Sequence, residues 1–165
     1  IAATLMAGAP RPLRLCYAGQ VVKLRASQLR PAREMLQVGA ELVGSESVAA
    51  AAEIVAIAID ALEAAGIGPV TVDFTLPDAL ERLAGPNVDR DRLSAISTAL
   101  DGKDAGALTA LDAAEWLPLL AATGNFASAL AALRAFDSRG VLADQIAALE
   151  TIAARIDGRA RLMLD

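Results

Sequence analysis

Two stretches near the start of the sequence, 13–23 and 33–43, constrain the fold most strongly. The first has β-branched and aromatic residues that favour a strand, the second is predicted to be its partner, and a polar loop with Pro31 near its end separates them. Side chains on a strand alternate between two faces, so each stretch has an odd-numbered and an even-numbered face. We therefore predict two strands joined as a hairpin.

The two faces of the second predicted strand differ in polarity. Even positions such as Leu36 and Val38 are apolar, which predicts a core-facing side. Gln37 and Glu41 both fall on the odd face, and Gly39 between them leaves room for a group to approach the backbone. The odd face is therefore the candidate binding surface.

The same parity on the first strand suggests how a site is built. If the odd faces of both strands coincide, a shallow pocket forms over Gly19 and Gly39. It is cationic at the loop end, through Lys23 and Arg33, and acidic at Glu41. Such a pocket suits a zwitterionic free amino acid. The alternative is that these polar groups cover the solvated face of an ordinary antiparallel sheet and bind nothing.

A long helix and a further strand follow the predicted hairpin. The Ala-rich stretch 46–65 predicts a helix, with Ser45 or Ser47 as its N-cap and Glu46 in its first turn. Residues 70–74 alternate apolar and polar side chains, which predicts a half-buried strand.

From residue 85 onward the pattern is mainly helical. A short helix with Pro77 in its first turn is predicted just before residue 85. After it we predict helices near 89–100, 105–122, 125–136 and 141–156. Pro118 is expected to kink or split the second of these four, and Trp116 to anchor their core. The last residues predict another strand. This order gives an α+β fold with an all-helical insertion.

Composition excludes several classes of protein. The sequence has no histidine, which removes Ser-His and Cys-His catalysis, and its one cysteine, Cys16, is predicted to be a small buried apolar residue. We predict no catalytic residue, no metal site and no cofactor in these residues. No apolar run is long enough for a membrane span, and no signal peptide is recognisable, so a cytoplasmic location is expected. The first residue is not methionine, which suggests a piece of a longer polypeptide.

Charge is distributed unevenly along the chain. Residues 1–44 hold six Lys or Arg against two Asp or Glu, whereas the chain as a whole has a net charge of −5. A nucleic-acid-binding protein usually presents a broad basic face, which this acidic chain lacks, so no nucleic-acid partner is expected. A small anionic group fits the local basic segment better.

The predicted hairpin resembles motif 2 of class II aminoacyl-tRNA synthetases, specifically the histidyl branch. The resemblance rests on the spacing Arg-x-x-x-Gln-x-Gly-x-Glu at Arg33–Glu41, on Tyr17 and Gly19 in the preceding strand, and on the helix that follows. It implies a class II synthetase-like antiparallel sheet. Residues 1–85 would belong to the catalytic-type domain, 86–158 to a helical insertion, and 159–165 to the start of a return strand.

Two departures from the synthetase pattern change the expected function. The motif 2 arginine that the family uses for ATP and the substrate carboxylate is Lys23 here, and the glutamate two residues later is Arg25. Lysine keeps the charge but loses the bidentate fork. The family's two contacts to the amino group of histidine, Gln37 and Glu41, are present. Arg25 and Arg33 are further candidate anion contacts.

This combination resembles a synthetase paralogue without aminoacylation activity, the regulatory subunit of short-form ATP phosphoribosyltransferase. "RLCYAGQVVKLR" and "LQVGAEL" carry that likeness. The resemblance implies a role in histidine biosynthesis, a short catalytic subunit as partner, feedback by histidine, and a homodimer within a hetero-octamer. The alternatives are a divergent histidyl-tRNA synthetase fragment and an interaction scaffold that binds no ligand. The first predicts an arginine at position 23 and a basic insertion, and the sequence has neither.

Overall fold

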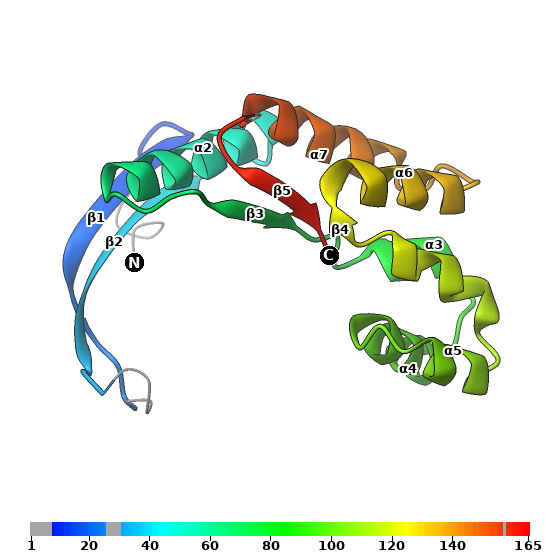
Figure 1. Ribbon diagram of the computed structural model, residues 1–165. Coiled ribbons are helices and arrows are strands. Elements are labelled where there is room, and N and C mark those ends of the chain that lie inside the picture. Colours follow the sequence, from blue (N-terminus) through cyan, green and yellow to red (C-terminus); the bar gives the residue numbers. More distant parts are fainter. Residues whose placement is uncertain (1–7, 26–30, 157) are drawn as a thin grey trace. The chain divides into compact units, whose positions relative to one another are not determined.

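The structure is a computed structural model that describes residues 8–25, 31–156 and 158–165 (Figure 1). The chain divides into two compact units, Ile1–Ile67 and Gly68–Asp165. The predicted boundary at residue 85 is a different division, and the extent of an insertion domain stays a prediction. Residues 26–30 of the predicted loop lie outside the described residues.

The first unit is built on the predicted hairpin. Strands β1 (Leu13–Val22) and β2 (Glu34–Val43) pair antiparallel, and Tyr17 lies opposite Gly39. Odd residues pair with odd residues throughout this register, so the two odd faces coincide. Both predicted strands are confirmed.

Helix α2 (Val48–Ala64) follows the hairpin and begins at a serine cap. The Ser47 side chain accepts a hydrogen bond from the Ala50 amide at 3.2 Å, and the Ser45 and Ser47 hydroxyls are 3.0 Å apart. Ser47 is therefore the cap, and Glu46 precedes it. The prediction that Glu46 lies in the first turn was wrong, because the helix starts two residues later.

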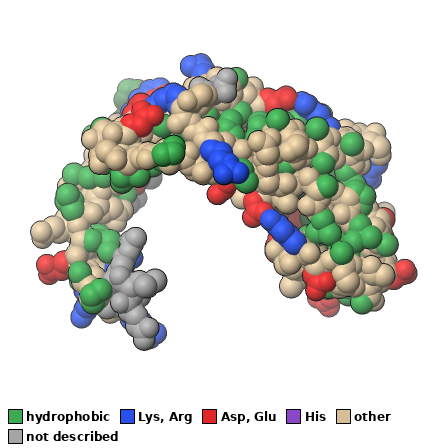
Figure 2. All heavy atoms as spheres, viewed as in Figure 1, with side chains coloured by type: hydrophobic (Ala, Val, Ile, Leu, Met, Phe, Trp, Pro, Cys, Tyr) green, Lys and Arg blue, Asp and Glu red, His purple; other side chains and the backbone are tan. Residues whose placement is uncertain are grey.

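The even face of the hairpin is less buried than predicted. Leu36 and Val38 are 72% and 64% exposed, and Cys16 is an exposed free thiol rather than a buried apolar residue. On α2, only Ala50, Ala52 and Ile59 are buried. Two strands and one helix cannot enclose both faces of a sheet. Apolar side chains consequently reach the surface of the hairpin (Figure 2).

The second unit combines a small mixed sheet with helices. Its elements in chain order are β3 (Thr71–Phe74), α3 (Ala79–Ala84), α4 (Arg90–Asp101), α5 (Ala105–Ala110), the 3₁₀ helix η1 (Ala114–Ala121), β4 (Gly124–Asn125), α6 (Phe126–Phe136), α7 (Ala143–Arg155) and β5 (Arg161–Leu164). The strand order is β3-β5-β4, with β5 parallel to β3 and antiparallel to β4. Parallel strands need a long crossover, and the helices between β3 and β5 supply it.

The helical predictions hold in outline and differ in detail. The predicted helix 105–122 is divided into α5 and η1, and the break lies before Pro118, which itself lies inside η1. Pro77 precedes α3, whose N-cap is Asp78, so its predicted place in the first turn was wrong. The two-residue strand β4 has no counterpart in the sequence predictions, because so short a strand leaves no alternating pattern.

The core of the second unit lies among its helices. Trp116 is 8% exposed and packs against Phe136 with ring centroids 5.7 Å apart, which confirms it as a core anchor. The buried carboxylate of Asp137 accepts hydrogen bonds from the amides of Val141 at 3.0 Å and Leu142 at 2.7 Å. Asp137 therefore fixes the turn that leads into α7.

Candidate functional site

The shared odd face of the hairpin is the candidate site, and Tyr17 organises its middle. Gln37 Nε2 donates a hydrogen bond to Tyr17 Oη at 2.9 Å. A Cβ atom added at Gly39 would lie 2.5 Å from both Tyr17 Cζ and Tyr17 Oη, so the ring covers this glycine. An aromatic ring packed over a cross-strand glycine is a known way to stabilise a strand pair.

This packing corrects the predicted pocket. The surface over Gly19 is open, with no atom within 4 Å of an added Cβ, whereas the surface over Gly39 is occupied by Tyr17. Tyr17 has the odd parity of this face, but no role at the site was predicted for it. An aromatic residue at the same parity as a glycine on the neighbouring strand was the available signal.

At the loop end of the face, Arg33 forms hydrogen bonds with the backbone of Lys23. Its Nε donates to the carbonyl oxygen of Lys23 at 3.1 Å, and the Lys23 amide donates to the Arg33 carbonyl at 2.8 Å. The side chains of Lys23 and Arg25 form no hydrogen bond or ion pair with any described residue. They are therefore available cations beside the loop.

Glu41 lies at the opposite end of the face, opposite Leu15, and is exposed. Within the described part of the chain its carboxylate has no hydrogen-bond or ion-pair partner. Seven residues lie between it and Arg33, which makes eight residue steps, and Gln37 is midway. At about 3.3 Å per residue the Cα separation between Glu41 and Arg33 is roughly 26 Å. The hairpin thus brings Gln37 to Tyr17 but does not bring Lys23 and Glu41 into contact.

The even face of β1 is attached to α2 by an ion pair that the sequence did not reveal. Arg14 Nε and Nη2 donate to the two carboxylate oxygens of Glu53 at 2.5 and 2.9 Å. The hydrogen bond from Arg14 holds the pKa of Glu53 below its ordinary value. A cavity of about 200 Å³, lined in part by Cys16 and Ile57, lies beside this pair.

The described residues contain neither a group of three metal-ligating side chains nor a helix that could cross a membrane. Among residues 8–25, 31–156 and 158–165, no group of three or more His, Cys, Asp or Glu side chains is placed to hold a metal ion. None of the helices in the described part of the chain is both long and apolar enough to cross a membrane.

Known proteins share both the sequence and the fold. The family described as histidyl-tRNA synthetase matches residues 1–165. A structure described as an ATP phosphoribosyltransferase regulatory subunit/histidyl-tRNA synthetase from Bacillus halodurans C superposes with a TM-score of 0.78 at 22% identity. It covers 99% of this chain and 46% of the other. The chain belongs to the histidyl-tRNA synthetase family and has its class II synthetase-like α+β fold.

Curated relatives identify a particular branch of this family. Proteins named ATP phosphoribosyltransferase regulatory subunit are 43% identical over 141 residues in Rhodospirillum centenum, 40% over 142 in Paramagnetospirillum magneticum and 39% over 160 in Rhodospirillum rubrum. These matches cover 83%, 83% and 94% of this chain, but only 36%, 37% and 42% of the relatives. The predicted resemblance to ATP phosphoribosyltransferase regulatory subunits is confirmed.

Proposed function

We propose that this chain is part of a non-catalytic regulatory subunit of ATP phosphoribosyltransferase in histidine biosynthesis. The relatives at 39–43% identity carry that name. In this proposal the whole protein is cytoplasmic and forms a homodimer within a hetero-octamer. It activates a short catalytic subunit and makes that subunit sensitive to histidine.

The observation that carries the proposal is the contrast between the two ends of the odd face. At the loop end, Lys23 and Arg25 stand where the synthetase pattern has arginine and glutamate. A lysine offers a point charge instead of a planar fork, which is a poor substitute for holding ATP in a reactive geometry. Farther along β2, Gln37 is oriented by Tyr17 and Glu41 has no competing partner among the described residues.

Histidine is the proposed ligand of this face, through its amino group. Gln37 and Glu41 share the face and flank Gly39, and the Glu41 carboxylate, which has no partner among the described residues, complements an ammonium group. Lys23 was predicted to contact the carboxylate of the same amino acid, with Arg25 and Arg33 as further cations near the loop. Because about 26 Å of strand separates Arg33 from Glu41, one amino acid cannot meet Glu41 and these cations together, so the cations are proposed to hold a separate anionic group.

Reconstitution tests the proposed function. The full-length protein and a short ATP phosphoribosyltransferase catalytic subunit are copurified, and the rate of phosphoribosyl transfer is measured with and without histidine. We expect the full-length protein to raise the rate and to confer inhibition by histidine. An unchanged rate and unchanged inhibition reject the proposal.

A divergent histidyl-tRNA synthetase is the second candidate, because the matching family and the structural relative from Bacillus halodurans both carry that name. An aminoacylation assay with histidine, ATP and transfer RNA separates the two. Histidylation by the wild type would favour the synthetase. The regulatory proposal expects none, and none in a Lys23→Arg variant, because Arg25 still replaces the glutamate.

A further inference from the structure

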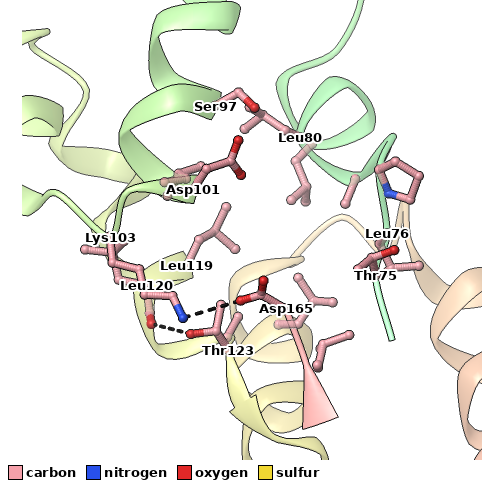
Figure 3. A pocket seen from close by; sticks show the side chains of 17 residues that line it. Thr75, Leu76, Leu80, Ser97, Asp101, Lys103, Leu119, Leu120, Thr123 and Asp165 are labelled. Atoms are coloured by element: carbon pink, nitrogen blue, oxygen red, sulfur yellow. Dashed lines mark hydrogen bonds and ion pairs between the residues drawn. The ribbon is translucent and has the colours of Figure 1, made fainter. Parts of the chain in front are cut away.

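The second unit contains a cavity of its own. It occupies about 390 Å³, within the range of roughly 300–1,000 Å³ typical of small-molecule pockets. Thr75 follows β3 and Asp165 follows β5, so the cavity lies at the carboxyl ends of two parallel strands (Figure 3). Ligands commonly bind at this end of parallel strands.

The walls of the cavity are mainly hydrocarbon. Leu76 and Leu80 contribute from the α3 side, Leu100 from α4, and Leu119 and Leu120 from η1. These five side chains are all partly exposed rather than buried. An apolar ligand group would therefore cover leucine surface that now faces water, which favours binding.

The rim of the cavity carries charges of both signs. Lys103 Nζ lies 3.3 Å from Asp165 Oδ1, and both side chains are more than half exposed. Asp101 also lines the cavity, and its carboxylate has no hydrogen-bond or ion-pair partner among the residues that the structure describes. Figure 3 shows Asp101, Lys103 and Asp165 around the leucine side chains. The rim thus offers one ammonium and two carboxylates above an apolar chamber.

The end of α4 fixes the two neighbouring charges. The helix ends at Asp101, and Lys103 has a φ of 51°, in the left-handed region that residues with a Cβ rarely adopt. Its amide donates to the Leu100 carbonyl at 2.9 Å, and the next amide, of Asp104, donates to Ala99 at 2.8 Å. These bonds hold the backbone in place, and the helix C-terminus favours a cation there.

We propose that this cavity binds a free α-amino acid with an apolar side chain. The Asp101 carboxylate accepts a hydrogen bond from the α-ammonium group, and Lys103 contacts the α-carboxylate. The side chain of the bound amino acid fills the leucine-lined chamber. A zwitterion with a hydrocarbon side chain satisfies the rim and the walls together. A simple hydrocarbon leaves the charges unmatched, and a polar amino acid leaves the leucines in contact with water. The site shares no residue with the hairpin face and does not depend on the proposed regulatory function.

Calorimetric titration of the full-length protein with L-leucine tests this site. We expect saturable binding that Gln37→Ala and Glu41→Ala leave unchanged. Two analogues probe the rim: 4-methylpentanoate lacks the ammonium, and 3-methylbutylamine lacks the carboxylate. Each is expected to bind roughly tenfold more weakly than L-leucine, because each loses a charge-assisted contact. Equal binding of all three would refute the assigned roles of Asp101 and Lys103.

Variants locate the binding. Asp101→Asn is expected to weaken L-leucine binding roughly tenfold, whereas its matched control Asp91→Asn, on the same helix but outside the cavity lining, leaves it unchanged. Ser97→Phe adds bulk to the lining without altering a charge and is expected to abolish binding. The proposal is overturned if L-leucine does not bind at roughly 10 mM, a concentration that detects even millimolar affinity. It is also overturned if Asp101→Asn binds like the wild type.

Discussion

Gly39→Ala, compared with Gly19→Ala, tests how the hairpin face is built. Both glycines lie on the odd face, but only the Gly39 Cβ meets another group, because it would lie 2.5 Å from Tyr17 Cζ and Oη. The added methyl must therefore displace the ring. The same methyl at Gly19 meets no atom within 4 Å and leaves Tyr17 in place.

The magnitudes follow from exposure and hydrogen bonding. Tyr17 is 44% exposed, so its ring can rotate toward solvent instead of forcing the strands apart. Displacement breaks the bond from Gln37 Nε2 to Tyr17 Oη, worth about 0.5–1.5 kcal/mol. Replacing a strand glycine with alanine returns about 0.5–1 kcal/mol. Gly39→Ala should change the free energy of unfolding by less than about 1 kcal/mol, and Gly19→Ala should raise it by about 0.5–1 kcal/mol.

Side-chain NMR of the full-length protein measures the displacement directly. In the wild type and in Gly19→Ala, we expect nuclear Overhauser contacts between the Tyr17 ring and the Gln37 amide. In Gly39→Ala these contacts should vanish, and histidine affinity should fall about tenfold because Gln37 is no longer held in position. Tyr17→Phe assigns the ring signals. Retention of the contacts in Gly39→Ala, or their equal loss in Gly19→Ala, would refute the described packing.

Further predictions concern the buried carboxylate of Asp137 and the ion pair between Arg14 and Glu53. Asp137→Ala should lower the free energy of unfolding by about 2–4 kcal/mol in denaturant titration, since two amides lose a buried carboxylate, whereas the exposed Asp144→Ala should change it by less than about 1 kcal/mol. Equal effects would contradict this role. Because the pKa of Glu53 is lowered by Arg14, the stabilisation from this pair is present at neutral pH and is lost as pH falls below about 4. The stability difference between wild type and Arg14→Met should therefore shrink in acid and in high salt. A difference independent of pH would show that the pair contributes nothing.

Local patterning was enough to predict the hairpin, because strand alternation and the loop between the strands depend on neighbouring residues. The same alternation placed Gln37 and Glu41 on one face with Tyr17, and the register confirms that placement. The long helix and the mainly helical second half followed from similarly local signals. The break before η1 was placed only approximately. A proline indicates that a helix is interrupted nearby, but it does not determine the residue at which the break lies.

Tertiary contacts were harder to predict. Arg14 and Glu53 are far apart in the sequence, and nothing in their local pattern pairs them. Cys16 was assigned to a core because it lies at an even position, on the side of the hairpin predicted to face the core, yet burial requires a covering layer that the described residues do not supply. The cavity near Lys103 was missed because it joins segments from residue 75 to residue 165.

Histidine binding to the full-length protein tests the central claim most directly. Titration calorimetry would compare the wild type with Glu41→Ala and with Glu34→Ala, a matched control on the same strand but on its even face. Loss of the carboxylate that receives the ammonium group should cost about 1–3 kcal/mol, or roughly 5- to 150-fold in affinity. We predict that weakening in Glu41→Ala and wild-type affinity in Glu34→Ala. Equal affinity in all three proteins would contradict a histidine site on this face.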